Sequence, residues 1–298
     1  MHTQESPLAE PLRVAIIGTG NIGCDLLLKV IASPQLQCVL FAGRRATSPG
    51  IALAESHGVP TTAGGIDALA ALADGIDLVF DATSATDAVH NWKVLEALGI
   101  PVVDLTPANL GRFCVPALNL EECLTEPNVS MVSCGGQAAV PIARCFSDAA
   151  EDGLGYLEIV TASSSASVGP GTRANIDEYA FTTQKATHEF SRVDKARTIL
   201  IINPAEPGIV MRNTIAVPDS ENIDLDALRV AVEHMEKRIH SYVPGYRVVV
   251  PPIVTDGRVM VTIEVEGLGD WLPRYAGNLD VITCAAVAVA EGRAEARR

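Results

Sequence analysis

The sequence predicts an α/β protein in which a doubly wound parallel sheet is followed by an α+β domain. Short β-branched runs alternate with helical stretches in the first third of the chain, which is typical of right-handed strand–helix–strand units. A glycine-rich turn follows the first of these runs. After Cys134 the strands become longer and alternate in polarity, which is typical of a sheet with one covered face.

The first domain is expected to span residues 1–133. Its first strand, at 13–17, ends at Gly18, and the helix that follows at 22–33 keeps one apolar face. The remaining strands are the short apolar runs that a buried parallel sheet requires. They are expected at 37–42, 78–80, 102–104 and 129–133, with a further helix at 84–98.

The second domain is expected to span residues 134–277 and to carry the substrate site and the surface for self-association. One amphipathic helix, at 225–240, accompanies its strands. The segment 278–298 is helical again and is expected to pack back on the first domain. The strands are expected at 157–163, 198–203, 209–217, 246–253 and 258–265.

The composition excludes several classes of protein. The 298 residues suffice for about two domains, and a content of 48% hydrophobic and 19% charged residues excludes a disordered chain. The formal net charge of −14 argues against a sequence-independent nucleic-acid binder, which needs basic side chains to neutralise phosphates. The same acid excess disfavours an anionic membrane surface as a partner.

The cysteines and histidines do not form a metal-binding pattern. Seven cysteines are scattered without a CxxC pair, and no HxxxH or HExxH pair occurs, so no metal site is predicted. No basic and apolar leader is visible, and the apolar run at 282–290 is too short to span a bilayer. We therefore expect a cytoplasmic protein in which most cysteines are reduced core residues.

A GxGxxG turn lies between the first strand and the first helix. Its glycines allow a tight turn and a close approach of the backbone to a pyrophosphate, and the helix N-terminus attracts the anion. This context predicts a dinucleotide site, and a glycine-rich turn without a ligand is the alternative. The turn residues are Gly18, Thr19, Gly20, Asn21, Ile22 and Gly23.

Two arginines, Arg44 and Arg45, follow the second strand. Folds that bind NAD usually place an acidic residue here to accept a hydrogen bond from the ribose 2′-hydroxyl, whereas arginine accommodates a 2′-phosphate. Neither guanidinium can accept a hydrogen bond. The pair therefore favours tolerance of NADP, and two solvated loop arginines are the alternative.

Cys134 has a sequence setting that the other six cysteines lack. It follows a short strand and precedes a helical run at 138–150, which places it at or just before a helix N-terminus. The positive helix end is expected to lower the pKa of the thiol, and the two glycines after it are expected to admit a substrate carbonyl. Cys134 is thus a candidate nucleophile, with a buried structural thiol as the alternative. The loop at 169–175 is rich in donors and either clamps a ligand or is a plain turn.

Five segments together resemble one enzyme family, the acylating (acetylating) acetaldehyde dehydrogenases. This family works with a 4-hydroxy-2-oxovalerate aldolase in the meta-cleavage degradation of aromatic compounds. The matches run in order over nearly the whole chain. They are the Gly-Thr-Gly-Asn-Ile-Gly turn at 18–23, Met-Val-Ser-Cys-Gly-Gly-Gln-Ala at 131–138, Gly-Pro-Gly-Thr-Arg-Ala-Asn-Ile-Asp-Glu at 169–178, Asn-Pro-Ala-Glu-Pro at 203–207 and Leu-Pro-Arg-Tyr-Ala-Gly-Asn-Leu-Asp at 272–280.

The resemblance implies an α/β fold like that of the glyceraldehyde-phosphate and semialdehyde dehydrogenases, and a reaction of a short aldehyde, CoA and NAD⁺ that gives acyl-CoA and NADH. Cys134 would form a thiohemiacetal and then an acyl-thioester. A homo-oligomer and an aldolase partner are also implied. Besides the glycine turn, the cofactor contacts implied are Ser165, Ser167, Gly169, Gly171, Thr172, Arg173 and Asn278.

The chain departs from the family pattern at three places. The family typically has an acidic residue where this chain has Arg45, an aspartate where it has Asn213, and Ser-Lys-Ser where it has residues 165–167. Asn213, placed among the catalytic residues by the resemblance, can form a hydrogen bond but cannot take a proton. The alternative functions are a semialdehyde dehydrogenase that does not use CoA and a non-catalytic nucleotide-binding protein of the same fold.

Overall fold

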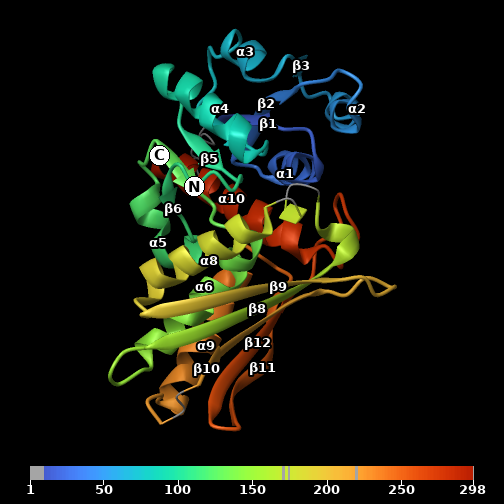
Figure 1. Ribbon diagram of the computed structural model, residues 1–298. Coiled ribbons are helices and arrows are strands. Elements are labelled where there is room, and N and C mark those ends of the chain that lie inside the picture. The colour runs from blue at the N-terminus through green and yellow to red at the C-terminus, as the bar shows by residue number, and fades with distance from the viewer. Residues whose placement is uncertain (1–9, 170–171, 174, 219–220, 298) are drawn as a thin grey trace, which may run out of the picture.

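The computed structural model describes residues 10–169, 172–173, 175–218 and 221–297. Within these residues a seven-stranded parallel sheet and a five-stranded mixed sheet lie at opposite ends of the molecule (Figure 1). The predicted fold class is confirmed. The parallel sheet has the order β3-β2-β1-β4-β5-β7-β6. Its strands are β1 (Leu12–Ile17), β2 (Leu36–Gly43), β3 (Thr61–Ala63), β4 (Leu78–Asp81), β5 (Val102–Asp104), β6 (Arg112–Phe113) and β7 (Asn128–Ser130).

Helices cover both faces of the parallel sheet, because alternate residues of its strands enter two different cores. In β1, Val14 and Ile16 pack with the helices on one side, and Ala15 and Ile17 pack with those on the other. This explains why the strands are apolar throughout. The helices are α1 (Asn21–Ala32), α2 (Pro49–Ser56), α3 (Gly65–Ala70), α4 (Ala85–Ala97) and α5 (Pro116–Cys123).

The mixed sheet has the order β11-β12-β10-β8-β9, and only β8 and β9 run parallel within the part of the chain described. Helices α6, α8 and α9 pack on this sheet, and the core between them holds Phe146, Ile215 and Tyr246. The strands are β8 (Tyr156–Ser164), β9 (Lys195–Asn203), β10 (Met211–Val217), β11 (Tyr246–Thr255) and β12 (Arg258–Val265), and the helices are α6 (Cys134–Asp148), α8 (Ile176–Ser191) and α9 (Leu225–His240).

Two differences from the expected elements lie near Cys134. The strand expected at 129–133 ends at Ser130, because Val132 has a φ of 61°, which no strand residue adopts. A β-branched residue is strained in this left-handed region. Helix α8 was not predicted at all, and it packs beside α6.

Helix α10 (Gly277–Ala296) follows the mixed sheet in sequence but packs against α1 and the parallel sheet (Figure 1). Its residues Ala286 and Val289 belong to the core of that sheet. A buried ion cluster joins the two helices: the Lys29 ammonium lies 2.7 Å from Asp25 and 2.8 Å from Asp280. Among the described residues no helix is long and apolar enough to cross a membrane.

Candidate functional site

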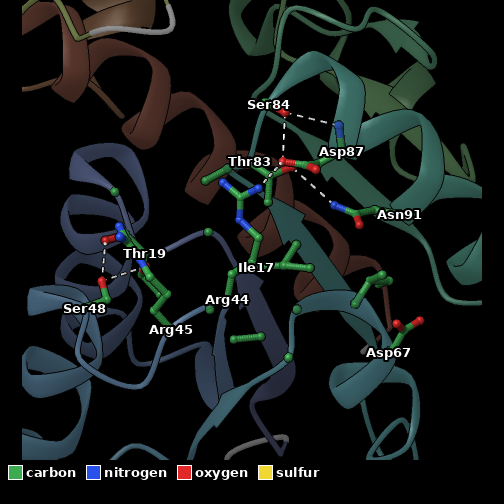
Figure 2. A pocket seen from close by; sticks show the side chains of 18 of the residues that line it. Ile17, Thr19, Arg44, Arg45, Ser48, Asp67, Thr83, Ser84, Asp87 and Asn91 are labelled. Atoms are coloured by element: carbon green, nitrogen blue, oxygen red, sulfur yellow. Dashed lines mark hydrogen bonds and ion pairs between the residues drawn. The ribbon is translucent and has the colours of Figure 1, made fainter.

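Two adjoining cavities lie at the carboxyl ends of the parallel strands, where ligands bind in open α/β sheets. The larger, of about 890 Å³, is lined by residues that follow β1, β2 and β4, and Figure 2 shows it from close by. The smaller, of about 290 Å³, contains Cys134. Both are lined by Gly20 and by residues 82–84, so together they form one groove from the arginines to the cysteine.

The glycine turn sits at the middle of this groove, and its three glycines have different tasks. Gly18 has a φ of 115°, and a Cβ there would lie 2.4 Å from the carbonyl oxygen of Ala82. A Cβ on Gly23 would lie 1.9 Å from the Gly18 oxygen. A Cβ on Gly20 would meet nothing within 4 Å, because this position faces the groove. The outer glycines therefore serve the fold, and the middle one keeps the groove open.

The N-terminus of α1 points its donors into the same part of the groove. Gly20 is its N-cap and makes no side-chain capping bond, so no side chain competes with a ligand for the first N–H groups of the helix. Asn21 Oδ1 accepts a hydrogen bond from Trp271 Nε1 at 3.0 Å. Thr19 Oγ1 accepts one from Ser48 at 2.8 Å. These contacts fix the turn and its helix for binding an anion.

The two arginines after β2 line the far end of the groove and take different directions (Figure 2). Arg44 points toward α4, where its Nη1 lies 3.5 Å from Oδ2 of Asp87. Arg45 lies on the side of Thr19 and Ser48 and forms no ion pair with any residue that the structure describes. Arg45 is thus the cation available to a further anion at this end.

Cys134 is the first residue of α6 and is half-buried in the smaller cavity. Ser133 caps this helix by accepting a hydrogen bond from the Gly136 N–H at 2.9 Å. Burial raises the pKa of the Cys134 thiol to about 11, although the N–H groups of Gly135 and Cys134 and the Tyr179 hydroxyl act to lower it. The expectation of a lowered pKa is therefore wrong, because desolvation outweighs the helix N-terminus at this position.

The glycines after Cys134 make room for protein atoms. A Cβ on Gly135 would lie 1.8 Å from the Tyr179 oxygen, and a Cβ on Gly136 would lie 2.7 Å from Val132 Cγ1. The space that we assigned to a substrate carbonyl beside Gly135 thus holds the Tyr179 hydroxyl. Tyr179 was missed by the sequence reasoning, together with α8. The signal available was the helical spacing of the residues that α8 buries, Tyr179, Thr182, Thr183, Ala186 and Thr187.

Asn213 lies behind the cavity and does not line it. It is fully buried in β10, and its Oδ1 accepts a hydrogen bond from Thr161 Oγ1 at 2.5 Å. Its Nδ2 has no hydrogen-bond partner among the described residues. Asn213 therefore reaches the neighbourhood of Cys134 only through Thr161 and Tyr179.

The residues implied as further cofactor contacts divide into two groups. Ser167, Gly169, Thr172 and Asn278 line the Cys134 cavity, and Asn278 Nδ2 donates to the Ser167 carbonyl at 3.1 Å. Arg173 turns away and donates to Ser165 and Val168 backbone oxygens, so it braces the loop. Gly171 lies outside the described residues.

Comparisons with known proteins show relatives of this chain over its whole length. The family model described as "Prokaryotic acetaldehyde dehydrogenase, dimerisation" matches residues 134–273. The chain is 66% identical to acetaldehyde dehydrogenase 2 of Salinispora arenicola (strain CNS-205), over all of both chains. It is 48% identical to an acetaldehyde dehydrogenase of Spirochaeta aurantia, over 97% of this chain and 96% of that one.

A solved structure shows a similar fold at low sequence identity. It is aspartate semialdehyde dehydrogenase II of Vibrio cholerae, with a TM-score of 0.63 and 13% identity over 95% of this chain and 98% of that one. At this identity the likeness concerns the fold alone.

Proposed function

Because this chain belongs to the acetaldehyde dehydrogenase family, we propose that Cys134 forms an acyl-thioester from a short aldehyde and transfers the acyl group to CoA. The family activity is the CoA-acylating oxidation of acetaldehyde. One observation carries the assignment: Cys134 lies in the cavity that adjoins the glycine turn, so a dinucleotide in the groove and an aldehyde at the sulfur would meet.

The groove fits a nicotinamide dinucleotide in two independent respects. The open face of Gly20 and the N-terminus of α1 suit a pyrophosphate. Asn278 Oδ1 lines the Cys134 cavity, is buried, and has no hydrogen-bond partner among the described residues, so it can accept a hydrogen bond from a carboxamide N–H. When bound, the nicotinamide supplies the hydride acceptor.

The reaction at the cysteine follows from its surroundings. The sulfur adds to the carbonyl carbon, and loss of hydride and of the hydroxyl proton from the resulting thiohemiacetal leaves a thioester on Cys134. The thiol of CoA then attacks the thioester and releases acyl-CoA. The half-buried position of Cys134 limits the access of water, which would otherwise hydrolyse the thioester.

Mass spectrometry of the protein tests this proposal. Incubation with acetaldehyde and NAD⁺ in the absence of CoA is expected to add one acetyl group, at Cys134. Addition of CoA is expected to remove it. A semialdehyde dehydrogenase that hydrolyses its thioester would turn over without CoA, and a non-catalytic protein would show no adduct, so either result would overturn the proposal.

We further propose that Arg45 allows the site to use NADP, because this side chain forms no ion pair with a described residue at the groove end. The variant Arg45→Asp is expected to lower kcat/KM for NADP relative to NAD by at least tenfold, since it replaces a phosphate ligand by a ribose ligand. Steady-state kinetics with both cofactors measure this ratio. The control is Arg258→Asp, a substitution of an exposed residue in β12, which is expected to leave the ratio of the two kcat/KM values unchanged. A strong NAD preference of the unaltered enzyme would contradict the proposal.

The family description also supports a homo-oligomer, for which the mixed sheet offers a surface. In β10 the buried Ile215 and Val217 face the helices, whereas Thr214 and Ala216 alternate with them toward the other face. We propose a dimer through this face, and sedimentation velocity is expected to give twice the mass of one chain. The variant Ala216→Arg is expected to yield monomers, and an unchanged dimer would exclude this face.

The implied aldolase partner is a separate proposal that co-purification tests.

A further inference from the structure

We propose that Tyr179 is a catalytic residue of this site, whose hydroxyl carries a proton between the Cys134 sulfur and the oxygen of the substrate. The proposal rests on the proposed thioester chemistry at Cys134. It assigns a task to a residue from α8, an element separate from those that carry the cysteine and the glycine turn.

The Tyr179 hydroxyl lies beside the residue that follows the nucleophile, in the same cavity. Tyr179 is only 6% exposed and lines the same cavity as Cys134. Its oxygen occupies the space beside Gly135, the residue that follows the cysteine, and lies close to Thr161 Oγ1 at that place. It is also near enough to Cys134 for a hydrogen bond between them to influence the ionisation of both groups.

The Tyr179 hydroxyl faces more than one hydrogen-bonding group. The hydroxyl makes no hydrogen bond of standard geometry with any described residue, although it is fully buried. Thr161 uses its single proton to donate to Asn213 Oδ1, so toward Tyr179 it offers only lone pairs. The Tyr179 proton can therefore turn toward Thr161, toward the sulfur, or toward an oxygen atom in the cavity. A buried hydroxyl without a hydrogen bond of standard geometry is uncommon in folded proteins.

The surroundings of Cys134 call for a neutral proton carrier. Burial keeps the thiol protonated at neutral pH. Asn213, which accepts a hydrogen bond from Thr161 behind the cavity, cannot take the proton. No other titratable group of the described residues lines the Cys134 cavity. A shuttle that creates no separated charge suits such a site, because an isolated buried charge is costly.

The addition step balances without an external base. As the Sγ–C bond forms, the thiol proton passes to the Tyr179 oxygen and the Tyr179 proton passes to the aldehyde oxygen. The carbonyl π bond opens into the hydroxyl of the thiohemiacetal, and Tyr179 ends as it began. Loss of hydride from this intermediate also releases its hydroxyl proton, which passes to water as one H⁺. In the second half-reaction the CoA thiol proton takes the reverse route: the Sγ–C bond breaks, the CoA sulfur–carbon bond forms, and Cys134 recovers its proton through Tyr179.

The variant Tyr179→Phe removes only the hydroxyl. We expect kcat/KM for acetaldehyde to fall by about 10²–10⁴-fold, the usual contribution of a positioned acid–base group, with an unchanged Kd for NAD⁺. The matched control is Tyr246→Phe, which removes a buried hydroxyl that donates to the Ala138 carbonyl of α6 at 2.9 Å. This control is expected to lower Tm and to keep kcat/KM within about threefold.

A second readout does not depend on turnover. Alkylation of Cys134 by iodoacetamide at pH 8, followed by mass spectrometry, is expected to slow several-fold in Tyr179→Phe, since the Tyr179 hydroxyl no longer acts to lower the pKa of the thiol. Thr161 is a positioning residue in the same chain. Thr161→Val is expected to lower kcat/KM, whereas Thr161→Ser keeps the hydroxyl and restores it.

The outcomes separate this inference from the proposed function. Full activity and unchanged alkylation in Tyr179→Phe would overturn the shuttle and leave the thioester proposal standing. A fall in kcat/KM no larger than that of the Tyr246→Phe control would also overturn the shuttle. If the unaltered protein forms no acyl adduct, the proposed function fails, and the alkylation rates still report whether Tyr179 contacts the sulfur.

Discussion

Replacement of Cys134 by alanine is expected to lower acyl-CoA formation by about 10³-fold or more, because no other described residue of its cavity is a nucleophile of comparable strength. The alanine side chain is smaller and apolar, so the N-terminal turn of α6, capped by Ser133, stays intact. NADH production from acetaldehyde should vanish with acyl-CoA production, and the Kd for NAD⁺ measured by titration calorimetry should change by less than about twofold. This combination would identify a lost chemical step with a preserved cofactor site.

The control for this variant comes from the same helix. Cys145 is buried in α6, and its sulfur contacts the Pro141 carbonyl at 3.3 Å away from both cavities. Cys145→Ala should lose stability, as expected for truncation of a core residue, and keep its activity. Acyl-CoA formation by Cys134→Ala at the rate of the unaltered enzyme would end the assignment of Cys134 as the nucleophile.

The second large effect is expected at the glycine turn, where one substitution should lower stability and another should lower cofactor affinity. In Gly23→Ala the new Cβ lies 1.9 Å from the Gly18 carbonyl oxygen, so α1 must move away from β1. We expect a loss of about 3 kcal/mol or more in the free energy of unfolding. In Gly20→Ala the new Cβ meets no protein atom within 4 Å, so stability should change little.

The Gly20→Ala methyl group would instead occupy the space where a pyrophosphate approaches the backbone. We expect the Kd for NAD⁺ to rise more than tenfold. Urea unfolding and calorimetric titration of both variants measure the two effects. Tight NAD⁺ binding by Gly20→Ala would show that the dinucleotide does not cross this turn, and an undamaged Gly23→Ala would contradict the packing seen in the structure.

The sequence predicted the central strands of the parallel sheet well, because strands buried on both faces are short apolar runs, a pattern that fits few other secondary structures. No bounds of a helix or strand were predicted for the segment between β2 and β4, although it contains α2, β3 and α3. These elements are short, and Gly64 and Gly65 both have positive φ angles, so no periodic pattern could develop. Local propensity is weakest in such segments, where tertiary packing supplies most of the stability.

Helix α8 was missed for a different physical reason. Its buried face carries hydroxyl groups, because Thr183 donates to the Tyr179 carbonyl and Thr187 to the Thr183 carbonyl within the helix. A threonine that satisfies its own hydroxyl in this way can be buried, but it does not count as apolar in a sequence pattern. The missing α8 also explains the wrong pKa predicted for Cys134. The position of the cysteine follows from its neighbours in sequence, but the burial that raises its pKa comes from elements distant in the sequence.

The position of α10 has a consequence for how this protein reaches its native state. Residues 277–296 complete the core of the parallel sheet, and Lys29 finds the partner Asp280 only on that helix. During synthesis the ribosome therefore delivers the strands of the first sheet long before the helix that covers one of their faces. Until then the apolar face of the sheet that α10 covers and the Lys29 ammonium stay exposed to solvent. Exposed apolar surface is the condition under which nascent chains aggregate or recruit chaperones. Contacts between such distant residues also slow folding, and the core of the first sheet is complete only when residues 277–296 have been synthesised.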